Sequence, residues 1–142
     1  MTVDEILNTW KDDAEVDRLE LGEAAMTVSN LHAKYLSMLF FERARYIKLT
    51  QDFNSLKKVR WEYWNGILSN EDLKERGWKP QPLRILKQDI PMYLESDEVL
   101  MNLQLQLNLQ REKINILEDI LKHLSQRGYN IGNAIKWTQT LS

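Results

Sequence analysis

Cations and aromatic side chains alternate between residues 56 and 66, and this combination could bind nucleic acid. The residues concerned are Lys57, Lys58, Arg60, Trp61, Tyr63 and Trp64. On an α-helix, at about 100° per residue, the first lysine and both tryptophans lie on one narrow stripe, with the other two cations beside it. Cations displace the counterions of phosphates, and indole rings stack on bases of any sequence. The segment therefore predicts a surface for single-stranded nucleic acid.

The same pattern is also typical of a helix at a protein interface, with buried tryptophans and solvated lysines. Arg60 fits this alternative poorly, because it falls on the apolar seam of the helix between Leu56 and Tyr63. The segment by itself leaves both interpretations open.

Charge is unevenly distributed along the chain. The 142 residues carry a net charge of −2, which alone does not favour a nucleic-acid partner. Residues 1–23, however, hold eight acids and two cations, whereas residues 42–60 hold six cations and two acids. The basic segment predicts additional phosphate contacts from Arg43, Arg45 and Lys48.

No constellation of residues predicts catalysis or metal binding. The chain has no cysteine, which excludes thiolate metal sites and suits a reducing cytoplasm. His32 and His123 lack a second ligand at metal-binding spacing, and the sequence has no glycine-rich phosphate loop. No apolar run approaches the ~20 residues that span a bilayer. We therefore expect a cytoplasmic protein that is not an enzyme, binds no cofactor or metal and does not enter a membrane.

The apolar pattern predicts an all-α fold of long extended helices with a short irregular connector. From residue 20 to about residue 70, apolar residues recur at steps of three and four, which predicts one helix about 75 Å long. A capping box of Thr2 and Glu5 predicts a short helix before it, fading near residues 12–17. Because a domain of this size is only about 30 Å across, the long helix is expected to find partners.

The connector is expected to follow the end of this helix, near residues 66–70. Asn70 is expected to cap a turn over residues 71–76 that Gly77 ends. Pro80 and its neighbour Pro82 exclude a helix interior after that turn. Residues 83–94 are expected to be an extended connector that could contain a short strand.

A second long helix is predicted after the connector. Ser96 or Asp97 is expected to cap it, Arg127 to end it before Gly128, and Asn130 to cap a separate last helix. Apolar residues lie on the seam of the second helix and also beside it. A helix that is apolar on more than one face is buried on more than one face, which in so short a chain predicts a helical homo-oligomer. The residues expected to lie between subunits are Leu103, Leu107, Ile114, Leu117, Leu121 and Leu124.

Over its whole length the chain resembles the recombination mediator proteins of tailed phages, the UvsY type. One similar stretch is Lys58-Val59-Arg60 followed by Tyr63-Trp64-Asn65-Gly66, and the other is Gln126-Arg127-Gly128-Tyr129-Asn130-Ile131. The resemblance implies a non-enzymatic, ring-like homo-oligomer of seven subunits in the cytoplasm of the host cell. It also implies binding to single-stranded DNA, displacement of the single-strand-binding protein and loading of a RecA-like recombinase. By position, Lys58 and Arg60 would be the DNA-contacting pair.

The predicted function is therefore a recombination mediator, with DNA bound by residues 1–95 and subunits held together by residues 96–142. Several subunits on one strand would multiply weak single contacts through effective concentration. The alternative is a coiled-coil structural or assembly-chaperone protein of a virion with no nucleic-acid role. That alternative predicts oligomers that are insensitive to salt and ignore DNA.

Overall fold

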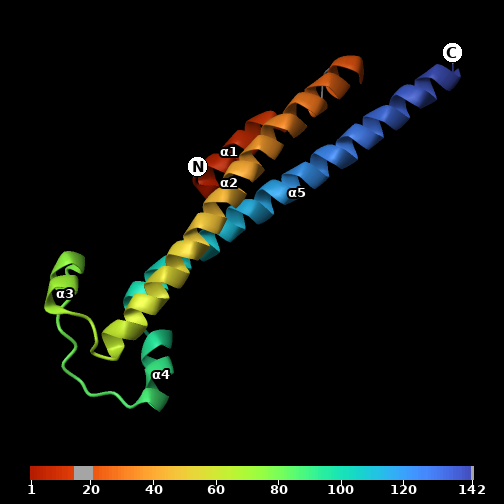
Figure 1. Cartoon of the computed structure of the whole chain (residues 1–142). Coiled ribbons are helices and arrows are strands. Elements are labelled where there is room, and N and C mark those ends of the chain that lie inside the picture. The colour runs from red at the N-terminus through yellow and green to blue at the C-terminus, as the bar shows by residue number, and fades with distance from the viewer. Residues whose placement is uncertain (15–20, 142) are drawn as a thin grey trace. The chain divides into compact units, whose positions relative to one another are not determined.

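The computed structural model describes residues 1–14 and 21–141, and every regular element within these ranges is a helix (Figure 1). The elements are α1 (Val3–Asp13), α2 (Leu21–Trp64), α3 (Asn70–Arg76), the 3₁₀ helix η1 (Lys87–Asp89), α4 (Ile90–Glu95) and α5 (Glu98–Leu141). The predicted all-α fold with two long helices is confirmed. The acidic stretch after α1, where the first helix was expected to fade, lies largely outside the described residues.

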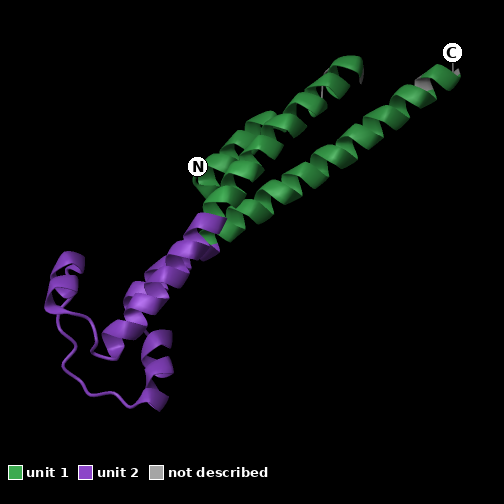
Figure 2. Cartoon of the chain, in the orientation of Figure 1, with its two compact units in different colours: residues 1–46, 109–142 green, residues 47–108 purple. Residues whose placement is uncertain are grey.

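The chain divides into two compact units (Figure 2). Unit 1 contains residues 1–46 and 109–142, and unit 2 contains residues 47–108. This division by packing differs from the functional division at residue 95, because each unit takes segments from both predicted regions. The functional division and the assembly of subunits stay predictions.

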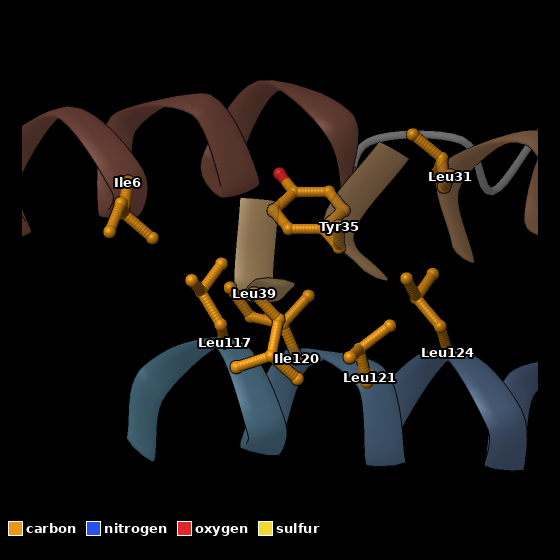
Figure 3. Close-up of a cluster of buried hydrophobic side chains, with 8 residues drawn as sticks. All are labelled: Ile6, Leu31, Tyr35, Leu39, Leu117, Ile120, Leu121 and Leu124. Carbon is orange, nitrogen blue, oxygen red and sulfur yellow. The ribbon is translucent and has the colours of Figure 1, made fainter. Parts of the chain in front are cut away.

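Three helical segments form the core of unit 1: α1, the first part of α2 and the second part of α5. In Figure 3 their side chains point toward one another. The members of this core are Ile6, Leu31, Tyr35, Leu39, Leu117, Ile120, Leu121 and Leu124. Steps of three and four residues keep the members from each long helix on one face. Full burial of such a side chain contributes about 1.5–3 kcal/mol, so these residues together stabilise unit 1.

The first helix begins at the predicted capping box. The Glu5 N–H donates to Thr2 Oγ1, and the Thr2 N–H donates to Glu5 Oε2, both over 3.1 Å. At the other end of α1, the Tyr35 hydroxyl of α2 donates to Asp13 Oδ2 over 2.8 Å. Burial, together with the Asp13 carboxylate, raises the pKa of Tyr35 above its ordinary value. Trp10 packs edge-on against the Tyr35 ring with centroids 5.6 Å apart, so the C-terminal end of α1 is fixed on α2.

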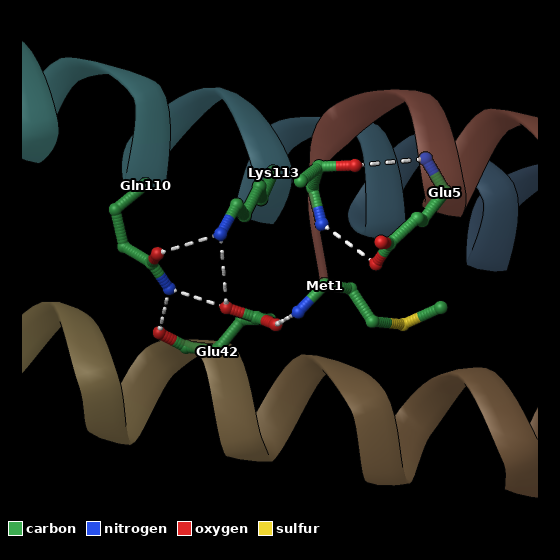
Figure 4. Close-up of polar contacts among 6 residues, drawn as sticks. Met1, Glu5, Glu42, Gln110 and Lys113 are labelled. Atoms are coloured by element: carbon green, nitrogen blue, oxygen red, sulfur yellow. Dashed lines mark hydrogen bonds and ion pairs between the residues drawn. The ribbon is translucent and has the colours of Figure 1, made fainter.

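A buried polar cluster joins the long helices within unit 1 (Figure 4). Glu42 of α2 is only 2% exposed. The Gln110 amide of α5 donates to Glu42 Oε2 over 2.6 Å and to the Glu42 backbone oxygen over 2.8 Å. The Lys113 ammonium and the Met1 ammonium lie 4.0 and 3.8 Å from the carboxylate. A buried carboxylate is costly without partners, so this cluster favours the register that brings Gln110 opposite Glu42.

Helix α5 continues past the end predicted for it. It runs through Gly128 to Leu141, so the predicted end at Arg127 and the separate last helix capped by Asn130 are wrong. A Cβ atom on Gly128 would lie 3.4 Å from Val28 Cγ1. This is an ordinary contact that does not require a glycine, and packing of α5 against α2 offsets the cost of about 1 kcal/mol that glycine has within a helix.

The connector in unit 2 departs from its prediction in two places. The cap of α3 is Ser69, whose Oγ accepts the Asp72 N–H over 3.1 Å, rather than Asn70. Residues 83–94 contain no strand, because η1 and α4 occupy their second half. Pro91 lies in the first turn of α4, where a missing N–H costs nothing. The end of α3 at Gly77, with φ of 69°, is as predicted.

Candidate nucleic-acid interface

The predicted nucleic-acid-binding residues are divided between the two units. Unit 2 holds Lys48, Lys57, Lys58, Arg60, Trp61 and Trp64, and unit 1 holds Arg43 and Arg45. Within unit 2 they all lie on the last part of α2, but they differ sharply in burial. That difference separates residues that can reach a ligand from those that hold the fold.

Arg60 is buried and paired. Only 6% of the residue is exposed, and its Nε donates to Asp97 Oδ2 over 2.6 Å. Its guanidinium carbon lies 4.1 Å from the centre of the Tyr63 ring and 4.6 Å from that of Trp78. The guanidinium therefore links α2, the connector and the residue preceding α5.

Asp97 is the centre of this buried contact. Its Oδ2 also accepts the Trp64 indole N–H over 2.9 Å. Its Oδ1 accepts the Val99 N–H over 2.9 Å, so of the two predicted caps of α5, Ser96 and Asp97, the structure has Asp97. Burial alone would raise the pKa of Asp97, but the hydrogen bonds from Arg60 and Trp64 and the charge of Arg60 hold it below its ordinary value. The carboxylate thus stays ionised in a dry site.

These contacts bear on the roles expected for Arg60 and Trp64. A phosphate would have to take Arg60 away from a buried carboxylate. A base that stacks on Trp64 would have to compete with Arg60 and Tyr93, which lie 5.6 and 5.1 Å from the centre of its ring. The Lys-x-Arg pair therefore divides, with Lys58 facing solvent and Arg60 facing the interior. A direct contact of Arg60 with DNA stays a prediction, and the geometry does not favour it.

The exposed members of the set within unit 2 are Lys48, Lys57, Lys58 and Trp61. The three lysines form no ion pair with any residue in the described ranges, and Trp61 is 47% exposed. Lys57 precedes Trp61 by one helical turn, whereas Lys48 lies about 180° around α2 from Lys57. A strand that follows the Lys57–Trp61 face therefore does not meet Lys48 on the same side of the helix.

Trp61 borders a groove of about 520 Å³ within unit 2, which we call the Trp61 groove. Phe53 and Trp61 of α2 form one part of its lining, and Leu94 of α4 and Met101 of α5 form another. Such a volume lies within the range of small-ligand sites. The groove therefore joins an exposed indole to an apolar surface.

Arg43 and Arg45 lie on exposed positions of α2 in unit 1. Arg43 pairs with Glu118 of α5 over 3.0 Å, and both side chains are nearly half exposed. An exposed pair of this kind is worth about 1 kcal/mol or less, so it would not prevent a phosphate contact.

Three cations of the connector are not among the residues predicted from the sequence. Residues 79–87 carry Lys79, Arg84 and Lys87 and no acid, all three are exposed, and none has an ion-pair partner among the residues that the structure describes. The connector is held on α2, because the Tyr63 hydroxyl donates to the Lys79 backbone oxygen over 2.9 Å. A charge count over this short window would have revealed them.

Most residues predicted to lie between subunits are buried within the chain itself. Leu107, Leu117, Leu121 and Leu124 are buried, whereas Leu103 and Ile114 are half-buried. The core within the chain already accounts for their apolar character. Their role between subunits stays a prediction.

The described residues contain no group of three side chains that could hold a metal ion. His123 instead packs edge-on against Trp10, with ring centroids 5.5 Å apart. Within the same residues, no helix has the length and apolar character needed to cross a membrane.

Comparison with known proteins finds one matching family and similar crystal structures. The family model described as "Recombination, repair and ssDNA binding protein UvsY" matches residues 9–142. Two crystal structures of the bacteriophage T4 recombination mediator protein UvsY, lattice types IV and II, are similar with a TM-score of 0.81 at 15% and 16% identity. The match covers 100% and 99% of this chain and 100% and 97% of those chains. No curated protein sequence matches.

Proposed function

Because this chain belongs to the UvsY family of recombination, repair and single-stranded-DNA-binding proteins, we propose that it is a non-enzymatic recombination mediator that binds single-stranded DNA through unit 2. One observation supports this location of the site. Lys57 and Lys58 are exposed, have no ion-pair partner within the described part of the chain, and lie one turn from the exposed indole of Trp61. The cations and the indole suit phosphates and bases respectively.

Binding at this surface is independent of sequence. Phosphate contacts from Lys57 and Lys58 fix the strand on α2 and carry no sequence information. Stacking on Trp61 adds affinity for any base, because every base has a π-face. A mediator needs this tolerance, since it must act wherever single-stranded DNA is exposed.

The proposed mediator activity depends on weak contacts with one DNA strand that several subunits repeat. One subunit offers few cations and binds weakly, but a homo-oligomer, a ring of seven by resemblance, multiplies these contacts on one strand. A strand held in this way is available to a RecA-like recombinase and is withdrawn from the single-strand-binding protein. The protein would do this in the cytoplasm of a phage-infected cell.

An exposed apolar residue supports an assembly through α5. Leu105 is 59% exposed and does not line the Trp61 groove. A large exposed apolar side chain gains by burial against another subunit. We place a subunit contact there, in addition to the buried seam of the predicted oligomerisation region.

Fluorescence anisotropy with labelled oligo-dT and with a duplex of equal length tests the proposed function. We expect tighter binding to oligo-dT than to the duplex, and an affinity for oligo-dT that falls steeply between about 50 and 200 mM salt. Oligomers that bind neither oligo-dT nor the duplex at low salt would support the structural role in a virion instead.

A further inference from the structure

We propose that the Trp61 groove receives one base of the bound strand, while Lys57 and Lys87 hold the phosphates on its two sides. The inference rests on the proposed binding of single-stranded DNA. It assigns the base to a defined site and makes the connector part of that site.

The groove has the lining that an unstacked base requires. Its surface includes Phe53 and Trp61 of α2 and the apolar side chains of Leu94 and Met101. At 47% exposure, much of the Trp61 indole remains in water without a ligand. A base that leaves the single strand and packs on this surface removes apolar area from water on both sides and gains stacking energy.

Charges at the groove match a base with its flanking phosphates. Lys57 of α2 and Lys87 of η1 both line the groove, and neither has an ion-pair partner among residues 1–14 and 21–141. Two cations from separate elements can contact successive phosphates while the base lies between them. Lys79 and Arg84, which precede Lys87 on the connector, are also exposed and add positive charge to it.

The remaining polar residues of the groove suit the edge of a base. Glu95 and Gln104 belong to the lining. A carboxylate accepts hydrogen bonds, and an amide both accepts and donates them, so together they can pair with the amino and carbonyl groups of a base. Glu95 would repel a phosphate at the same position, which favours a base inside the groove and phosphates at the lysines.

An apolar helix of a second copy is the competing occupant. Such a helix would cover Lys57 and Lys87 and remove them from water without supplying the opposite charges that they need. A nucleotide strand brings those charges with it. Charge complementarity therefore favours DNA over a second subunit in this groove.

The test compares oligo-dT with an abasic oligonucleotide of the same length, which keeps the phosphates and lacks the bases. The full-length protein, Trp61→Ala, Trp61→Phe and Lys87→Ala are titrated with both ligands by anisotropy. Light scattering and circular dichroism report oligomer mass and helicity for every variant.

We expect Trp61→Ala to lose about five-fold or more in affinity for oligo-dT and nothing for the abasic strand, because stacking contributes about 1–3 kcal/mol per base. Trp61→Phe should recover part of that loss. Lys87→Ala should weaken both ligands equally and lower the salt slope by about 0.7 per engaged subunit.

Two results would overturn the base site. One is an equal loss, or no loss, on both ligands for Trp61→Ala. The other is a changed oligomer mass for a helical Trp61→Ala protein, which would assign the groove to a second subunit. A wild-type protein that does not bind oligo-dT at all would instead refute the proposed function itself.

Discussion

Arg60→Met removes the guanidinium of a buried ion pair and keeps an unbranched apolar side chain in its place. In the native protein the two partners of this pair are 7% and 0% exposed at their side chains. The substitution leaves the Asp97 carboxylate in the same dry site without its cation. We therefore expect a loss of stability rather than a selective loss of DNA binding.

The structure sets the size of this loss. Removing one partner of a buried pair typically costs 3–5 kcal/mol. Asp97 keeps its hydrogen bonds from Trp64 and Val99, which places the loss toward the lower end, at about 3 kcal/mol. The cation–π contacts of Arg60 with Tyr63 and Trp78 add about 1 kcal/mol.

Urea unfolding at neutral pH, followed by circular dichroism, measures the effect. Lys58→Met is the matched control, because it removes an exposed cation two residues away and should change stability by less than about 0.5 kcal/mol. Asp97→Asn keeps a capping side chain but removes the charge. The double variant Arg60→Met with Asp97→Asn should therefore lose less than the sum of its two single variants.

A different pattern would refute this account of Arg60. If Arg60→Met is as stable as Lys58→Met and binds oligo-dT much more weakly than the wild type, the guanidinium reaches DNA. That result would restore the role that the resemblance implied for the Lys-x-Arg pair.

Further predictions concern the indoles, the pH dependence and the assembly. Oligo-dT should quench the fluorescence of a variant whose only tryptophan is Trp61 but not one whose only tryptophan is Trp64; equal quenching would contradict their different burial. The pKa of Asp97 is lowered in the folded protein, so its contribution to stability is present above its unfolded pKa of about 3.9 and lost as the pH falls below it. The urea midpoint should consequently decrease more from pH 7 to pH 3 for the wild type than for Asp97→Asn. An equal decrease would argue against this linkage. Leu117→Ala should cost about 2–5 kcal/mol through a cavity in the core, whereas Leu105→Glu should lower the oligomer mass with helicity unchanged; light scattering that shows the wild-type mass for Leu105→Glu removes that face from the subunit contact.

The features that could be predicted from sequence depend on neighbours within a few residues. The capping box of Thr2 and Glu5 needs only the first turn of a helix, and Gly77 ends α3 through its own backbone freedom. The spacing of apolar residues likewise predicts both long helices, because it involves only residues three and four positions apart. Local chemistry was sufficient for the order and type of the main elements.

Features that depend on distant parts of the chain could not be predicted in this way. Arg60 resembles other cations of its segment until Asp97, 37 residues later, is placed beside it. Gly128 is typical of a helix end, but α5 continues through it to Leu141. Periodicity shows that Leu117 is buried, but it cannot distinguish a partner within the chain from a partner subunit.

The candidate site was predicted only in part for the same reason. Lys57, Lys58 and Trp61 are close in sequence and stand out as a cationic and aromatic cluster. Lys87 lies 26 residues after Trp61, and only the folded connector brings it to the same groove. Its membership of the site therefore requires the structure.

The most direct test of the central claim is the salt dependence of oligo-dT binding by Lys57→Ala/Lys58→Ala, beside Lys122→Ala as an exposed control on α5. The claim predicts a folded double variant with weaker binding and a log–log salt slope that is lower by about 1.4 per engaged subunit, from two phosphate contacts at about 0.7 each. Lys122→Ala should retain the wild-type affinity and slope. Wild-type affinity and slope in the folded double variant would contradict the claim that unit 2 binds single-stranded DNA through this face of α2.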